Sequence, residues 1–393
     1  MLDTALKLLD EITSCGFQAY IVGGFVRDYI LGIESNDIDI NTNATPKEIK
    51  DIFDSCLPNE DYGSVTVIKK GVRFEITTFR KEMSYLDNRR PSQIEYIDDL
   101  YQDLLRRDFT INTLCMNKDG EIIDLLGGRD DIDKKIIRCV GKANIRFEED
   151  ALRILRAIRF ATILDFSLDE EVKAAIIYCR KLLRNLSYYR KKEELDKIFV
   201  CPRAKEGIDL LLKLGLDKYL DLDKLRYVTC CNSLIGIWSV LDVTDKYVFN
   251  SNEKQLIKTI NIVLKLNNLD PMTLYTYGLY ANSVAAEIKG IDIKSVTESY
   301  NNLVIHTKKD LDITSKDGLS LKGTLYRLHE NNNKVILSVH GYHGDGLRDM
   351  GRFGKMYEAL GYDLLLIDQR ACGISEGDYV SFGYHEQEDG ILW

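Results

Sequence analysis

The chain has 393 residues, of which 45% are hydrophobic and 29% charged, so it is long enough for two to four domains with buried cores. No apolar run approaches the ~18 residues of a membrane span, and the nine scattered cysteines are typical of reduced thiols in the cytoplasm. The net charge of −9 does not by itself indicate a nucleic-acid partner, although a local basic stripe can bind one despite the overall balance.

After an expected helix over residues 1–16, the stretch YIVGGFVRDYILGIESNDIDINTNAT over 20–45 carries the first chemical signal. It predicts a short buried strand, a sharp turn at Gly23 and Gly24, and a short helix that ends at Gly32. A glycine turn that opens a helix presents free N–H groups, which suit a phosphate.

Asp37 and Asp39 follow this turn in a predicted strand, where alternate side chains share one face. Two adjacent carboxylates repel each other unless a cation lies between them, and a hard divalent cation, most simply Mg²⁺, suits oxygen ligands. The five histidines all lie after residue 305, so a histidine base or a zinc–histidine site is excluded from the earlier part of the chain. A metal held over a phosphate-binding turn predicts in-line attack at phosphorus by a two-metal mechanism.

The order GG-F-V-R-D, D-I-D-I and T-N-A-T-P resembles the class II branch of the nucleotidyltransferase superfamily. That branch contains the CCA-adding tRNA nucleotidyltransferases and the bacterial poly(A) polymerases. The resemblance implies that Asp37 and Asp39 are catalytic metal ligands and that Gly24 and Arg27 bind the triphosphate.

Residues 65–69 and 73–79 alternate as two strands. In this family an acid on the second strand can lie beside the first two, so Glu75 is a candidate third catalytic acid; an exposed strand glutamate is the alternative. Residues 80–100 are polar and predict a mobile loop. In the CCA-adding enzymes a loop of this kind helps the site to change from adding C to adding A.

The sequence RRDFTIN over 106–112 matches the family's R-R-D-F-T-x-N motif, which lies near the nucleotide sugar and phosphates. The resemblance places Arg107 on the phosphates, where a guanidinium offers a fixed fork of donors. Asp108 and Asn112 are candidates for contacts with the ribose hydroxyls. The sequence DLLGGRD over 124–130 resembles the hinge between the catalytic head and the next domain.

Residues 145–164 predict one helix with an apolar stripe and with Arg153, Arg156 and Arg159 stepping along another side. A solvated basic face is one interpretation of these arginines. However, the sequence EDALR matches the family's E-D-x-x-R motif, in which Asp and Arg read the base of the incoming CTP or ATP. By resemblance, Asp150 accepts from an exocyclic amine that C and A share, Arg153 donates to ring atoms, and the other two arginines add affinity.

Residues 181–199 resemble the family's next helical motif, and 200–300 are helical by periodicity. From about residue 315 the pattern changes to strands, with a buried strand over 334–339, a helix over 348–360 and a second buried strand over 363–367. This order resembles the first half of an α/β-hydrolase.

A G-x-S-x-G pattern surrounds Ser375, but it lacks the strand directly before it and the helix directly after it that a nucleophile elbow requires. The histidines of this segment, His340, His343 and His385, do not match the family's late triad histidine. We therefore expect no hydrolase activity from it.

As a whole, the sequence predicts an α+β nucleotidyltransferase head over 1–130, an all-helical neck for base recognition over 131–200, a helical body that binds tRNA over 201–314, and the N-terminal half of an α/β-hydrolase-like fold over 315–393. The implied reaction is template-independent, Mg²⁺-dependent addition of CCA to tRNA 3′ ends from CTP and ATP in the cytoplasm, with no membrane or DNA partner.

Four alternatives stay open. The first is a poly(A) polymerase, but that group carries a basic G-R-R-F-R-type strand where this chain reads DYGSVTV over 61–67. The others are a CC- or A-adding relative, a tRNA-binding module without catalysis, and a bifunctional fusion with a hydrolase.

Overall fold

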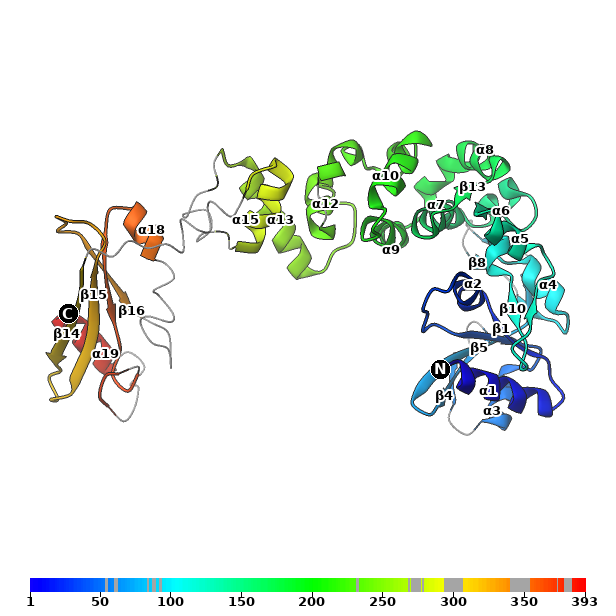
Figure 1. Cartoon of the computed structure of the whole chain (residues 1–393), viewed down its shortest axis with the longest axis horizontal. Coiled ribbons are helices and arrows are strands. Elements are labelled where there is room, and N and C mark those ends of the chain that lie inside the picture. Colours follow the sequence, from blue (N-terminus) through cyan, green and yellow to red (C-terminus); the bar gives the residue numbers. More distant parts are fainter. Residues whose placement is uncertain are drawn as a thin grey trace. The chain divides into compact units, whose positions relative to one another are not determined.

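The computed structural model describes residues 1–53, 56–59, 63–82, 85–86, 90–91, 94–230, 233–267, 269, 277, 279–292, 307–339, 354–372, 374–377 and 384–393. Its chain contacts define two units: Met1–Thr229 with Val243–Phe249, and Cys230–Asp242 with Asn250–Trp393. In Figure 1 the first unit runs from blue to green and the second from green to red. Within the part that the structure describes, none of the helices has the length and apolar character that crossing a membrane requires.

A seven-stranded sheet with the order β11-β10-β1-β2-β5-β4-β3 lies at the centre of the N-terminal region. Strands β2 and β5 pair in parallel, and the other pairs of this sheet are antiparallel. The strands are β1 (Ala19–Val22), β2 (Asp39–Thr42), β3 (Cys56–Asn59), β4 (Ser64–Lys69), β5 (Val72–Thr78), β10 (Cys115–Met116) and β11 (Ile122–Ile123).

Helices α1 (Leu2–Ser14) and α3 (Pro46–Ile52) lie together on one side of this sheet, and α2 (Gly24–Leu31) follows β1 directly (Figure 1). The apolar side of α1 is fully buried at Ala5, Leu8, Leu9 and Ile12, the i, i+3, i+4, i+7 spacing of a helix packed on one face. The strands predicted over 65–69 and 73–79 are confirmed as β4 and β5.

The predicted loop over 80–100 is only partly correct. Strand β6 (Arg80–Glu82) pairs with β9 (Ile94–Tyr96), and β7 (Tyr85–Leu86) pairs with β8 (Arg90–Pro91). Residues 83–84, 87–89 and 92–93 lie outside the described residues. Short strands of two or three residues carry too little alternation for a sequence pattern to reveal them.

Helices form most of the rest of the first unit, and the helices predicted after residue 130 are present. They are α4 (Leu100–Leu105), η2 (Thr110–Asn112), α5 (Gly128–Asp133), α6 (Ala143–Glu149), α7 (Leu152–Leu164), α8 (Glu170–Cys179), η3 (Arg180–Asn185), α9 (Tyr188–Phe199), α10 (Ala204–Lys213), α11 (Asp217–Leu220) and η4 (Leu225–Cys230). The short strands β12 (Ile136–Ile137) and β13 (Ser167–Leu168) pair in parallel among them.

The single helix predicted over 145–164 is wrong, because the chain breaks between α6 and α7. Asp150 has extended backbone angles (φ −141°, ψ 105°), and its carboxylate accepts from the N–H of Leu152, 3.0 Å away. The side chain therefore satisfies a free donor at the start of α7, as capping residues do. The helical periodicity continues across the break, which hides it from the sequence.

The second unit contains the helices α12 (Leu234–Leu241), α13 (Ser251–Lys265) and α15 (Leu279–Lys289), followed by a four-stranded sheet. The sheet has the order β14-β15-β17-β16, formed by β14 (Thr307–Thr314), β15 (Ser320–Arg327), β16 (Val335–Val339) and β17 (Asp363–Ile367). Helices α18 (Gly354–Ala359) and α19 (Tyr384–Leu392) accompany it.

Two predictions for this sheet need correction. Its first strand, β14, begins at Thr307 and pairs along its whole length with β15, so strand structure starts before residue 315. Strand β17 is buried throughout, as predicted, but β16 lies at the sheet edge and exposes Val335, Leu337 and Val339 by 40%, 40% and 46%. The predicted helix over 348–360 is present as α18, and residues 348–353 lie outside the described residues.

Candidate active site

The turn between β1 and α2 brings the backbone close to an arginine. Gly23 has φ 78°, in the region that favours glycine, and its N–H donates to the carbonyl oxygen of Leu114 at 3.1 Å. A Cβ atom at Gly23 would lie 2.9 Å from a guanidinium nitrogen of Arg107, so a side chain there would displace that arginine. Helix α2 then ends at Gly32 in the left-handed conformation, as predicted.

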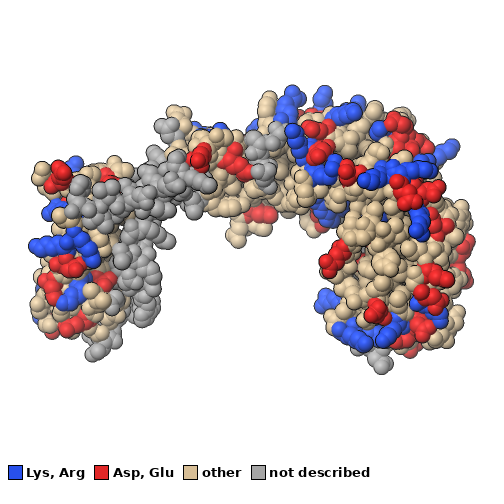
Figure 2. Space-filling model, in the orientation of Figure 1, with Lys and Arg blue, Asp and Glu red and all other residues tan. Residues whose placement is uncertain are grey.

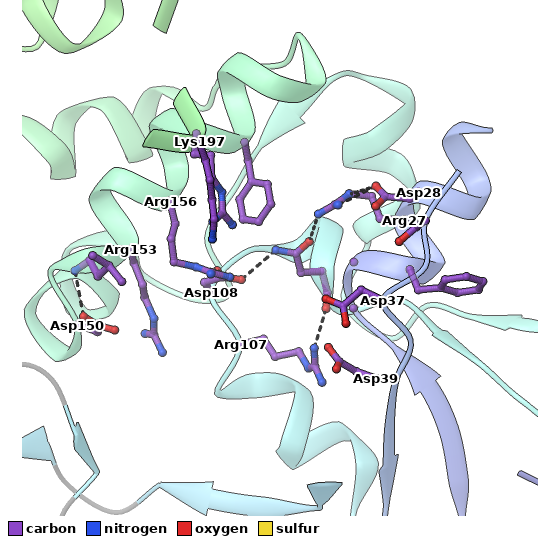
Figure 3. A pocket seen from close by; sticks show the side chains of 18 of the residues that line it. Arg27, Asp28, Asp37, Asp39, Arg107, Asp108, Asp150, Arg153, Arg156 and Lys197 are labelled. Atoms are coloured by element: carbon purple, nitrogen blue, oxygen red, sulfur yellow. Dashed lines mark hydrogen bonds and ion pairs between the residues drawn. The ribbon is translucent and has the colours of Figure 1, made fainter. Parts of the chain in front are cut away.

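Two carboxylates lie beside this turn, and a third is close to one of them on the sheet. Asp39 is the first residue of β2, whereas Asp37 lies just before the strand rather than within it. Figure 3 shows their carboxylates side by side, with Arg107 next to Asp39. Glu75 on β5 is the parallel-register partner of Asp39. Two separate stretches of sequence, 37–39 and the strand that carries Glu75, therefore meet where β2 begins, in the middle of the sheet.

The electrostatics of this corner favour a cation. Asp39 is exposed at the start of β2, but partial loss of hydration in this corner, together with the charges of Asp37 and Glu75, raises its pKa to about 6 against the opposing effect of Arg107. A divalent cation relieves such repulsion, so the carboxylates fit a metal. Among the described residues, no three His, Cys, Asp or Glu side chains form a complete metal-binding cluster. Water or phosphate oxygens would have to complete the coordination shell.

Asp108 is committed to neighbouring protein groups. One carboxylate oxygen accepts from Arg156 Nε (2.7 Å) and Nη2 (2.6 Å), and the other accepts from Asn112 Nδ2 (3.1 Å) and the N–H of Phe109 (2.8 Å). Burial alone would raise the pKa of Asp108, but these contacts outweigh it and lower the pKa to about 2. A carboxylate has about four acceptor positions, so these four donors occupy it.

Asp150 and Arg153 lie at the junction of α6 and α7, both held by hydrogen bonds. Arg153 donates to Glu149 at 2.8 Å and to the carbonyl oxygens of Arg146 (3.3 Å) and Arg106 (3.0 Å). Asp150 accepts from Arg190 on α9 at 3.3 Å, besides capping α7. The break at Asp150 thus lets this carboxylate reach Arg190 on α9 while it lines the same cavity as the arginines of α7.

Three more arginines each face one carboxylate. Arg27 Nη2 lies 2.7 Å from Asp28, and its Nη1 donates to Asn112 Oδ1 at 2.6 Å. Arg156 contacts Asp108 as described, and Arg159 donates to Glu194 on α9 at 3.0 Å. Burial lowers the pKa of Arg159, although Glu194 opposes that effect.

A cavity of about 610 Å³ connects these groups. It contains every predicted site residue except Glu75, namely Gly24, Arg27, Asp37, Asp39, Arg107, Asp108, Asn112, Asp150, Arg153, Arg156 and Arg159. Glu75 lines a second cavity of about 340 Å³ that shares Asp39, Arg106 and Arg107 with the first. Asp39 therefore lines both cavities, whereas Glu75 lines the second.

The cavity also holds residues that the sequence did not single out as a site, including Asp28, Phe160, Arg190 and Lys197. Lys197 and Arg190 both lie on α9, seven residues apart, which places them on the same side of the helix. Figure 3 shows Lys197 above Arg156, across the cavity from Asp39. Heptad spacing of basic residues could have found this pair.

Comparisons with known proteins bear on this site. Residues 19–138 match the poly A polymerase head domain family, and residues 165–223 match the probable RNA and SrmB-binding site of polymerase A. The CCA-adding enzyme of Bacillus subtilis is 34% identical over 350 residues, which cover 81% of this chain and 88% of that protein. The enzyme of Lactococcus lactis subsp. lactis is 36% identical over 343 residues, covering 80% and 86%.

The solved structures that resemble this chain are also CCA-adding enzymes. The Bacillus stearothermophilus CCA-adding enzyme in complex with CTP is 30% identical with a TM-score of 0.66, over 75% of this chain and 80% of that one. The Thermotoga maritima CCA-adding enzyme complexed with tRNA, at 20% identity and a TM-score of 0.61 over 77% and 83%, shares the fold. About one fifth of this chain lies outside each of the two sequence matches.

Proposed function

The chain belongs to the family of CCA-adding enzymes, and we propose that it adds C, C and A in turn to the 3′ end of tRNA from CTP and ATP. The observation that carries this proposal is the single cavity. Carboxylates suited to a metal, arginines suited to a triphosphate and the Asp150–Arg153 pair all line it. Nucleotidyl transfer needs these three functions within the length of one nucleotide.

We propose that Asp37 and Asp39 hold Mg²⁺, with Glu75 supporting from β5. Bound there, Mg²⁺ would activate the tRNA 3′-hydroxyl and neutralise charge on the leaving pyrophosphate. The raised pKa of Asp39 supports the assignment, because mutual repulsion of this kind is what a bound cation removes. Glu75 is exposed on β5, but it lies opposite Asp39 and lines the neighbouring cavity, and this position supports a catalytic role.

The triphosphate is proposed to lie along the β1–α2 turn. Gly24 and Phe25 line the cavity at the start of α2, where a helix has free N–H groups, and Arg27 and Arg107 line it as well. Asp108 and Asn112 were both candidates for the ribose. Since Asp108 is occupied by four donors, we assign it to orienting Arg156 and leave the ribose contact to Asn112.

Base selection is proposed to rest on Asp150 and Arg153. Arg153 is held in one orientation by carboxylate and carbonyl oxygens, so the edge that it presents is fixed before a nucleotide binds. A carboxylate beside it accepts the exocyclic amine that C and A share. The protein itself then acts as the template.

The helical part is proposed to bind tRNA in the cytoplasm. Figure 2 shows Lys and Arg side chains over the helices of the first unit, interspersed with Asp and Glu. Around the cavity, helices α7 and α9 concentrate positive charge, although the net charge of the chain is −9: they contribute Arg153, Arg156, Arg159, Arg190 and Lys197. Local basic surface of this kind attracts a phosphate backbone. We retain the predicted divisions: a head over 1–130, a neck over 131–200 and a body that follows.

We also propose that the C-terminal sheet is a partial α/β-hydrolase-like fold without hydrolase activity. It contains a parallel β16–β17 pair and an antiparallel β15–β17 pair, an arrangement compatible with the early strands of such a sheet. The hydroxyl of Ser375 donates to the carbonyl oxygen of Asp368 at 2.6 Å and accepts from the N–H of Lys322 at 2.7 Å. A hydroxyl fixed by backbone groups is poorly placed to act as a nucleophile. His340 and His343 lie outside the described residues, as does the side chain of His385.

The test offers CTP and ATP separately to tRNAs that end before the CCA, after CC and after the complete CCA. We expect two C additions to the first, one A addition to the second and none to the third. Continued addition of A to the third would favour a poly(A) polymerase. Addition of only C, or only A, would indicate a partial relative.

A further inference from the structure

Phe160 on α7 has an unusual set of neighbours. The guanidinium carbons of Arg159, Arg27 and Arg156 lie 4.4, 5.1 and 5.4 Å from the centre of its ring. Phe109 packs edge-on against the same ring at 5.8 Å. Phe160 is only 8% exposed, and the exposed part faces the cavity.

The three guanidinium groups reach this ring from two separate segments, α2 and α7. Each also forms an ion pair with a carboxylate, and the three carboxylates come from three places: Asp28 on α2, Asp108 after α4, and Glu194 on α9. All three arginines therefore contact the same ring. The π face of the ring attracts cations, and this attraction counteracts the mutual repulsion of guanidinium groups that lie so close together.

We propose that Phe160 is a positioning residue: it gathers Arg27, Arg156 and Arg159 into one cationic wall that binds the nucleotide triphosphate. The inference rests on the proposed function, since it assumes that the triphosphate enters this cavity. Arginine side chains lose much rotational freedom when they bind an anion, and a ring that orders them beforehand lowers that cost. An aliphatic residue would fill the same space without attracting the guanidinium groups.

If Phe160 only fills space, the loss of its ring should affect anion binding no more than the loss of another buried ring. If it positions the arginines, only the loss of its own ring should matter, and Phe166 is the control that separates these two cases. It follows α7 directly, is 6% exposed and lies outside the cavity lining. Phe166→Leu therefore removes an equally buried ring without touching the arginine cluster. Phe160→Tyr retains a ring and should preserve the wall, whereas Phe160→Leu should loosen it.

The experiment measures binding of inorganic tripolyphosphate by calorimetry, together with kcat and KM for CTP. For Phe160→Leu we expect about tenfold weaker tripolyphosphate binding and a similar rise in KM at nearly unchanged kcat, because all three guanidinium groups lose the ring that orders them. Phe160→Tyr and Phe166→Leu should both bind like the wild type. Each variant's melting temperature is recorded, and Phe160→Met replaces the leucine variant if that one fails to fold.

Unchanged tripolyphosphate binding in a folded Phe160→Leu or Phe160→Met variant would refute the positioning role, as would an equal loss in Phe166→Leu. Absence of tripolyphosphate binding by the wild-type protein would refute it too. If the wild type binds tripolyphosphate in a ring-dependent way but adds nothing to tRNA, the inference stands and the proposed function fails.

Discussion

Asp108→Asn tests whether the cavity depends on the buried ion pair between the head and α7. The substitution keeps the shape of the side chain and removes its charge. In the wild-type protein that charge faces Arg156 Nε at 2.7 Å and Nη2 at 2.6 Å, from a residue 48 positions further along the chain. The variant leaves the guanidinium opposite a neutral amide.

The magnitude follows from the pKa of Asp108, which falls from 3.8 to about 2 on folding. This shift corresponds to roughly 2.5 kcal/mol of stability at neutral pH, at about 1.4 kcal/mol per unit. Breaking a buried pair can cost 3–5 kcal/mol, but the Arg156 side chain is 32% exposed and water can solvate it. We therefore expect a loss of about 2–3 kcal/mol.

The pH dependence gives a second, independent check. Because the native pKa of Asp108 lies below the unfolded value, its contribution is complete above about pH 4 and is lost as the pH falls toward 2. The stability difference between wild type and variant should thus shrink by about 1 kcal/mol at pH 3 relative to pH 7.

Urea unfolding followed by circular dichroism measures both effects. Tryptophan fluorescence is unsuitable, because Trp238 and Trp393 belong to the second unit and would not report on this ion pair. We expect the first unit's midpoint to fall by roughly 1 M urea at pH 7. An unchanged midpoint, or the same difference at both pH values, would refute the reasoning.

Three further predictions concern function. Asp150→Ala or Arg153→Ala should relax selectivity toward UTP and GTP more than it lowers total turnover, as competition with the four labelled nucleotides will show. Glu75→Gln should lower kcat for C and A addition alike with little change in KM. An unchanged kcat would show that Glu75 has no catalytic role. Neither the wild type nor Ser375→Ala should hydrolyse a short-chain nitrophenyl ester or react with a fluorophosphonate probe, and turnover that Ser375→Ala abolishes would support a bifunctional protein.

Local chemistry made part of this site predictable. The turn at Gly23, the helix stop at Gly32 and the paired aspartates depend on residues close together in sequence, and the first two stand where the pattern indicated. The contacts of Asp108 could not be found in this way. Its carboxylate resembles a ribose ligand in the motif, yet the fold places a distant arginine on it.

Two errors in the predicted fold have a common cause: a periodic sequence pattern does not show which other parts of the chain pack beside it. Residues 145–164 keep a helical repeat through the break at Asp150, because the capping carboxylate occupies a polar position of that repeat. The run ending at Val339 is as apolar as a central strand, but its burial depends on the number of neighbouring strands. Among the described strands it has a neighbour, β17, on one side.

The central claim is that Asp37 and Asp39 support nucleotidyl transfer in this cavity. The most direct measurement is incorporation of labelled CTP into tRNA lacking its CCA end, in the presence of Mg²⁺. It compares the wild type, Asp37→Asn with Asp39→Asn, and the control Asp51→Asn on an exposed position of α3. We predict incorporation by the wild type and the control and a fall to background in the double variant; incorporation by the double variant at the wild-type rate would contradict the account.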